Sequence, residues 1–162
     1  MSQKYTDQDA KFMKRAIALS ADACGGDHAP HGGPFGTIIV RDGKIVGRGF
    51  NRVLVNHDPT AHGEIVAIRA ACKKLKTFDL TGCTLYTNAE PCPMCLAAAW
   101  WANIDKIFYA VGTSAADKIG FRDGEMYKQF KRPETGTQIK SEFVPAARAM
   151  LKWRAGCVNA VY

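Results

Sequence analysis

The stretch Glu90-Pro91-Cys92-Pro93-Met94-Cys95 places two thiols three residues apart. If a helix begins here, the two side chains point the same way and can hold one metal ion. Two thiolates cannot complete a tetrahedral site, so at least one more ligand must come from elsewhere in the chain. The natural candidate is His62, which lies 30 residues before Cys92 in the stretch Thr60-Ala61-His62-Gly63-Glu64.

The number of ligands indicates what such a site could do. Catalytic zinc sites use three protein ligands and leave the fourth position to water, whereas structural sites use four Cys or His ligands. His62, Cys92 and Cys95 would supply three. Glu64 points about 200° away from His62 on an ideal helix, so it is not an obvious fourth ligand. If His62 lies at the mouth of the helix, Glu64 can instead reach the water as a proton carrier.

A purely structural zinc site and a chain without metal are the alternatives. A structural site would need a fourth Cys or His nearby, and His28, His31 and His57 lack paired spacing. The sequence therefore favours a hydrolytic zinc site.

Length and composition are those of a single globular domain. The chain has 162 residues, 47% of them hydrophobic and 23% charged, which suits one domain over 1–162. The apolar stretch 94–103 is far too short to cross a bilayer, which needs about 20 residues. No signal peptide is visible, so we expect a cytoplasmic protein with free thiols outside the Cys92/Cys95 pair.

The charge balance is basic. The formal net charge is +7 and the pI is about 9.2, which would suit a polyanionic partner such as nucleic acid. The basic residues are spread along the chain, however, and this favours an ordinary solvated surface over a nucleic-acid partner.

The pattern of apolar residues predicts alternating helices and strands. Thr6 and Asp7 are expected to cap a helix that runs to about Cys24. Asp42-Gly43 predicts a hairpin between strands 37–41 and 44–50. A polar loop over 51–59, a helix capped by Thr60 and a strand over 83–87 are expected to follow. Next come a helix over 91–102 deep in the fold and a strand over 106–111. The remaining expected elements are short helices over 114–119 and 125–130, an extended segment over 138–143, and a last helix over 145–155. This order suits a mixed sheet between helices, with parallel pairing of the strands at 83–87 and 106–111.

Taken together, His62-Gly63-Glu64 and Pro91-Cys92-Pro93-Met94-Cys95 resemble the H-x-E…P-C-x-x-C signature of the zinc nucleobase deaminases. Further stretches look like those of bacterial guanine deaminases. They are Gly33-Pro34-Phe35-Gly36, Asn51, Asp58-Pro59-Thr60-Ala61-His62 and Gly120-Phe121-Arg122-Asp123. The resemblance implies the cytidine deaminase-like fold, an α/β three-layer α/β/α sandwich with a five-stranded mixed sheet.

The resemblance also implies residue roles. His62, Cys92 and Cys95 would bind one Zn²⁺ per subunit, and Glu64 would be the catalytic proton shuttle. Five residues are implied as substrate contacts. Asn51 would hydrogen-bond the base, and Phe35 and Trp101 would line the purine pocket. Asp123 would bind the guanine edge, and Tyr162 would reach the partner's active site in a domain-swapped homodimer. The plainer alternatives are a loop-initiating role for Asn51, core packing for Phe35 and Trp101, and helix capping for Asp123. Arg122 departs from relatives that often carry a second acid there.

The function implied is hydrolytic deamination of guanine to xanthine and ammonia, as in purine catabolism. Guanosine, cytosine or an aminotriazine are alternative substrates. A tRNA adenosine deaminase would explain the basic charge, but that family ends in a basic helix, whereas residues 155–162 are uncharged. A zinc-stabilised RNA-binding module is the non-enzymatic alternative, and the intact Glu64 disfavours it.

Overall fold

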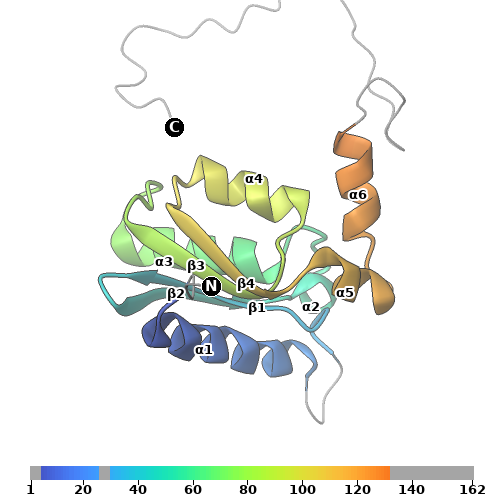
Figure 1. Cartoon of the computed structure of the whole chain (residues 1–162), viewed down its shortest axis with the longest axis horizontal. Coiled ribbons are helices and arrows are strands. Elements are labelled where there is room, and N and C mark those ends of the chain that lie inside the picture. Colours follow the sequence, from blue (N-terminus) through green and yellow to red (C-terminus); the bar gives the residue numbers. More distant parts are fainter. Residues whose placement is uncertain (1–4, 26–29, 132–162) are drawn as a thin grey trace, which may run out of the picture.

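The structure, a computed structural model, describes residues 5–25 and 30–131. In this part of the chain one mixed sheet lies between α1 on one face and α3 and α4 on the other, with α5 and α6 at one end (Figure 1). The elements in order are α1 (Asp7–Ala23), β1 (Gly36–Arg41), β2 (Lys44–Phe50), α2 (Val53–Asn56), α3 (Gly63–Leu75), β3 (Cys83–Ala89), α4 (Pro93–Trp101), β4 (Lys106–Val111), α5 (Thr113–Lys118) and α6 (Asp123–Phe130). The fold is α/β, as predicted.

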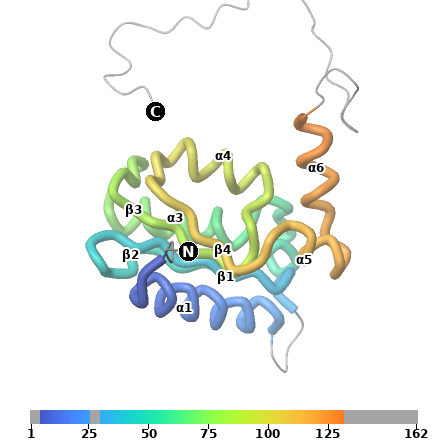
Figure 2. The backbone as a smooth tube through the Cα atoms, viewed as in Figure 1, coloured from blue at the N-terminus to red at the C-terminus, as the bar shows by residue number. Residues whose placement is uncertain are grey.

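The strand order is β2-β1-β3-β4. Figure 2 traces the backbone through the sheet, from α1 in blue to α6 in orange. β1 pairs antiparallel with both β2 and β3, whereas β3 and β4 are parallel and joined by α4. Among residues 5–25 and 30–131 the sheet has four strands, not the five that the resemblance implied. The expected extended segment 138–143 and the last helix 145–155 lie outside the described residues.

The first helix and the hairpin form where the sequence predicted. Thr6 and Asp9 form a reciprocal capping box at the start of α1, which satisfies two backbone N–H groups that would otherwise lack partners. In the hairpin turn Asp42 and Gly43 have φ values of 50° and 69°, the left-handed pair that a two-residue turn between right-twisted strands requires.

The core has two sides because neighbouring strand residues point to opposite faces of the sheet. Ile38 and Tyr86 pack with Ala16 toward α1, whereas Ile39 and Leu85 pack toward α3. α3 lies so close to β2 that a side chain at Gly47 or Gly49 would overlap the α3 backbone. This close contact holds α3, and with it His62, against the sheet.

Two helix predictions need correction. α3 is not capped by Thr60, because the Thr60 backbone N–H and hydroxyl both donate to Asp58 in a tight turn at 2.8 and 2.7 Å. His62 is the N-cap instead, in an extended conformation. α4 does not lie deep in the fold: Trp100 and Trp101 are 71% and 55% exposed. No helix in the described part of the chain is both long and apolar enough to cross a membrane.

Candidate active site

The site lies where β3 ends and α4 begins. β3 stops at Ala89, and the turn Glu90-Pro91-Cys92 leads into the helix. Cys92 is the N-cap of α4, so Pro93, and not Pro91 as expected, occupies the first helical turn, where its missing N–H costs no hydrogen bond. Cys95 lies one turn into the helix, so its thiol projects from the same end of α4 as that of Cys92.

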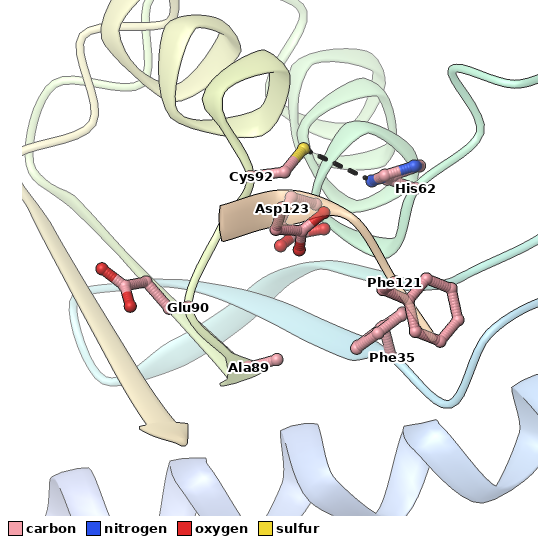
Figure 3. A pocket seen from close by; sticks show the side chains of 8 residues that line it. Phe35, His62, Ala89, Glu90, Cys92, Phe121 and Asp123 are labelled. Atoms are coloured by element: carbon pink, nitrogen blue, oxygen red, sulfur yellow. Dashed lines mark hydrogen bonds between the residues drawn. The ribbon is translucent and has the colours of Figure 1, made fainter. Parts of the chain in front are cut away.

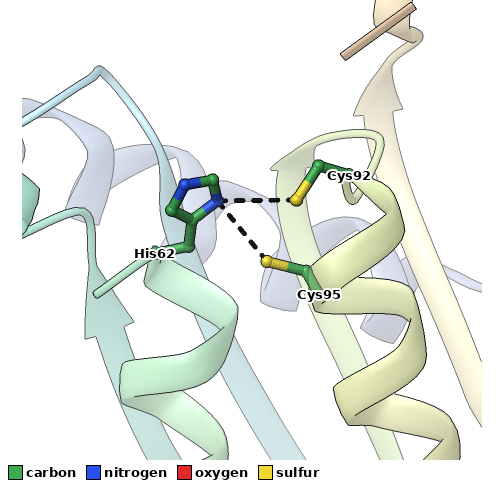
Figure 4. Close-up of side chains that lie close together, drawn as sticks. All are labelled: His62, Cys92 and Cys95. Carbon is green, nitrogen blue, oxygen red and sulfur yellow. Dashed lines mark hydrogen bonds between the residues drawn. The ribbon is translucent and has the colours of Figure 1, made fainter. Parts of the chain in front are cut away.

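His62 faces the two thiols from the start of α3 (Figure 4). Its Nδ1 atom lies 3.6 Å from Sγ of Cys92 and 3.6 Å from Sγ of Cys95, and the three ligand atoms all lie within 4.8 Å of one another. A tetrahedral zinc ion, with Zn–S of about 2.3 Å and Zn–N of about 2.0–2.1 Å, would place nitrogen and sulfur about 3.5–3.6 Å apart. The three donors therefore match zinc in both chemistry and spacing.

The protonation of the two thiols differs. The pKa of Cys92 is lowered to about 4. The largest cause is a hydrogen bond with Cys95, and a smaller contribution comes from a hydrogen bond with His62. The pKa of Cys95 is raised above its ordinary value, mainly by its hydrogen bond with Cys92 and by burial. The pKa of His62 is raised, chiefly by its hydrogen bond with Cys92. Cys92 thus already favours the thiolate, the form in which a cysteine binds metal.

Glu64 lies beside the three donors in the first turn of α3. Only 6% of its surface is exposed, and its Oε2 accepts a hydrogen bond from Cys95 Sγ at 3.4 Å. Burial is the largest cause of its raised pKa. A carboxylate whose pKa is raised is a stronger base than an ordinary one, which suits a group that must take up a proton and pass it on. The condition that His62 lie at the helix mouth is met.

A cavity opens beside His62 and Cys92 (Figure 3). The empty space inside it is about 290 Å³, including open solvent at its mouth. It is lined by Phe35, His62, Glu64, Ala89, Glu90, Cys92, Phe121 and Asp123. The rings of Phe35 and Phe121 meet edge to face, with centroids 4.7 Å apart. The two rings give the cavity an aromatic wall alongside its polar residues.

Asp123 enters the cavity from the first turn of α6. In the described part of the chain its side chain does not cap this helix: the N-cap is Arg122, without a side-chain bond, and the Gly124 N–H is bonded to Asp117 instead. Burial and the nearby Cys92 raise the pKa of Asp123. The carboxylate thus lines the cavity, and within residues 5–25 and 30–131 no hydrogen bond occupies its oxygens.

Two predicted substrate contacts, Asn51 and Trp101, do not line this cavity, and a third is not among the described residues. Asn51 is 2% exposed and accepts a hydrogen bond from the Val53 N–H at 3.1 Å, so it starts the loop after β2, and it is not among the cavity-lining residues. Trp101, at the end of α4, packs edge-on against Trp100 outside the cavity. Tyr162 lies outside the described residues.

Sequence reasoning missed two supporting residues. Phe121 belongs to the Gly120–Asp123 stretch that carries the resemblance, but no role was predicted for it, and it lines the cavity. Asn88 bonds the Phe35 segment to β3, donating to the Pro34 carbonyl and accepting from the Gly36 N–H, both at 2.9 Å. A polar residue near the end of an apolar strand was the available signal for Asn88.

Comparison with known proteins places these residues in a family context. The family model described as the cytidine and deoxycytidylate deaminase zinc-binding region matches residues 6–111. The chain is 49% identical to guanine deaminase of Bacillus subtilis over 122 residues, which cover 75% of this chain and 76% of that protein. It is 37% identical to a tRNA-specific adenosine deaminase of Aquifex aeolicus, with 72% and 74% covered. The X-ray structure of guanine deaminase from Bacillus subtilis superimposes with a TM-score of 0.79 at 42% identity, covering 85% of this chain and 86% of that one.

Proposed function

Because this chain belongs to the cytidine and deoxycytidylate deaminase zinc-binding family, we propose that it is a zinc-dependent aminohydrolase that converts guanine to xanthine and ammonia. The observation that carries the proposal is the arrangement around one cavity: His62 and Cys92 of the three clustered donors, the buried Glu64 and the carboxylate of Asp123 all line it, and Cys95 lies beside His62. The 49% identity to a guanine deaminase supports guanine as the substrate.

The chain's residues divide the work between holding the metal and moving protons. His62, Cys92 and Cys95 hold the zinc ion, which when bound supplies a hydroxide nucleophile near neutral pH. Glu64 takes the proton that water gives up and delivers it to the exocyclic nitrogen of guanine. A C–O bond forms, the C–N bond breaks, and the amine leaves as ammonia. Burial of Glu64 supports this role, because it keeps the proton at the reacting atoms.

The rest of the cavity orients the base. The Asp123 carboxylate accepts hydrogen bonds from the N–H groups on one edge of guanine, and a base without those donors leaves a half-buried carboxylate unpaired. Phe35 and Phe121 pack against the ring. We also propose that Asn51, Trp101 and Tyr162 contact the base in the assembled enzyme, where the partner subunit completes the site.

We further propose that 1–162 is a single deaminase domain, that its C-terminal segment is exchanged between two copies in a homodimer, and that it acts in purine catabolism in the cytoplasm. The exposed apolar side chains of α4, among them Leu96 and Trp100, supply a surface that a partner subunit could cover. The five cysteines of the described residues form no disulfide, which suits a reducing compartment.

A tRNA adenosine deaminase is the second candidate. It is favoured by the net charge of +7 and by the 37% identity to a tRNA-specific adenosine deaminase. Such an enzyme flips its target base out of the RNA into a pocket with the same zinc chemistry. Deamination of guanosine, cytosine or an aminotriazine would use the same residues with different edge contacts.

One experiment separates these candidates. The zinc-loaded protein is incubated in parallel with guanine, guanosine, cytosine, adenine, an aminotriazine and tRNA, and ammonia release is followed. The Glu64→Gln protein serves as a blank for contaminating deaminases. We expect release from guanine well above every other substrate. Release from tRNA or from another base without release from guanine would overturn the proposed substrate.

A further inference from the structure

Asp123 owes its position to the helix that carries it. In the described residues its carboxylate makes no hydrogen bond or ion pair that would hold it in place. Packing holds α6 only loosely: none of its residues is buried, and Met126 and Phe130 are 41% and 65% exposed. Something else must therefore fix the distance between Asp123 and the metal donors.

Tyr127 supplies such a link. It lies four residues after Asp123, so both side chains project from the same face of α6. Its hydroxyl donates to the backbone oxygen of Pro91 at 2.8 Å, and Pro91 is buried directly before Cys92. One hydrogen bond thus joins the helix that carries the carboxylate to the turn that carries a metal ligand.

Two further contacts hold the rest of the segment that leads to Asp123. The Glu90 carboxylate accepts a hydrogen bond from the Thr113 N–H at 3.0 Å, at the start of α5, and Phe121 packs edge-on against Phe35. Both contacts come before Asp123 in the chain. Beyond Asp123, the Gly124 N–H donates to Asp117 at 3.1 Å and so joins α6 to α5, whereas Tyr127 joins α6 to the turn that carries Cys92. Loss of the Tyr127 hydrogen bond would therefore let α5 and α6 shift together relative to that turn.

We propose that Tyr127 is a positioning residue that sets the place of Asp123 over the metal donors and thereby the affinity for the base. This inference rests on the proposed function and on the proposed role of Asp123 in it. Tyr127 touches neither the base nor the metal; it acts through α6.

The test is a double-mutant cycle between Tyr127→Phe and Asp123→Asn in the zinc-loaded protein. Loss of one net hydrogen bond predicts a roughly two- to tenfold rise of KM for guanine in Tyr127→Phe, with kcat and zinc content nearly unchanged. In the Asp123→Asn background, Tyr127→Phe should change KM much less. Tyr109→Phe, which removes a hydroxyl from a half-exposed tyrosine of β4, is the matched control and should behave as wild type.

Two readouts do not depend on turnover. In the inactive Glu64→Gln background, the Kd for 8-azaguanine should rise by a similar factor when Tyr127 is changed, and the α6 amides should exchange with deuterium faster. An unchanged KM and Kd, or an equally large effect in the Asp123→Asn background, would overturn the inference. If the wild-type protein released no ammonia from guanine, the proposed function would fail. Separately, if the α6 amides exchanged as slowly in Tyr127→Phe as in wild type, the positioning role of Tyr127 would be refuted.

Discussion

Replacing Glu64 with glutamine tests the proton carrier without changing the size of the side chain. General acid–base catalysis contributes roughly 10²–10⁴-fold to a rate. Only 6% of the Glu64 surface is exposed, so bulk water has little access to carry the proton in its place. We therefore expect kcat to fall by about 10³–10⁴-fold, in the upper part of that range.

The zinc content separates this explanation from simple damage to the site. Glu64 is not one of the three clustered donors, so the variant should still hold one zinc ion per chain. Ammonia release measures kcat, and elemental analysis measures zinc. Glu125→Gln is the matched control, because Glu125 lies on the exposed surface of α6 in an ion pair with Lys128. A kcat within tenfold of wild type, or loss of zinc together with activity, would refute the role given to Glu64.

Three further changes test the site and the fold. Cys95→Ser should reduce zinc well below one ion per chain and abolish ammonia release, because a thiolate donor is lost; full zinc content by elemental analysis would remove Cys95 from the ligand set. Gly49→Ala should destabilise the fold by about 1–3 kcal/mol, since the new Cβ would overlap the Gly63 carbonyl; an unchanged thermal midpoint would contradict this. Tyr86→Phe loses a 2.6 Å hydrogen bond to Asp9, at a cost of about 1 kcal/mol near pH 7. Burial and Asp9 raise the pKa of Tyr86 above its ordinary 10.0, so the unfolded chain ionises first and the wild type loses stability above pH 10. The difference in unfolding free energy between the wild type and Tyr86→Phe should therefore become smaller above pH 10. Denaturant titrations from pH 8 to 11 that show a constant difference would contradict this prediction.

Much of the fold follows from local sequence. The Thr6 cap and the Asp42-Gly43 turn are short-range signals, and the structure confirms both. Asp7, the second expected cap, is instead the first residue of α1, and Asp9 completes the capping box. The exposure of α4 could not be predicted in the same way, because composition shows how apolar a helix is but not which surface covers it. The start of α3 was also missed, since Thr60 can cap a helix or bond to Asp58, and the three-dimensional path of the loop decides between them.

In the candidate site, too, the residues set by local spacing could be predicted, and those placed by long-range folding could not. Zinc as the cofactor is confirmed, and the prediction that His62, Cys92 and Cys95 lie together is met by the geometry. Fixed spacing in the chain carries that information. Asp123 and Phe121 reach the cavity from beyond β4, and their place depends on how α5 and α6 fold back. Such long-range placement leaves no local pattern in the sequence. Only the family resemblance pointed to Asp123 as a cavity residue. The same resemblance placed Trp101 in the pocket, whereas in the described structure its side chain lies on the surface.

The metal ligands come from two segments that lie far apart along the chain. His62 is separated from Cys92 and Cys95 by 30 and 33 residues, so an ion held by all three closes a loop of that length. By the chain-entropy estimate for a cross-link, closing about 30 residues restricts the unfolded chain by roughly 3–4 kcal/mol. Zinc bound by the Cys92/Cys95 pair alone gives none of this long-range restriction. The catalytic zinc ion therefore also acts as a reversible cross-link between the start of α3 and the start of α4. Its removal should lower the stability of the fold as well as abolish the reaction.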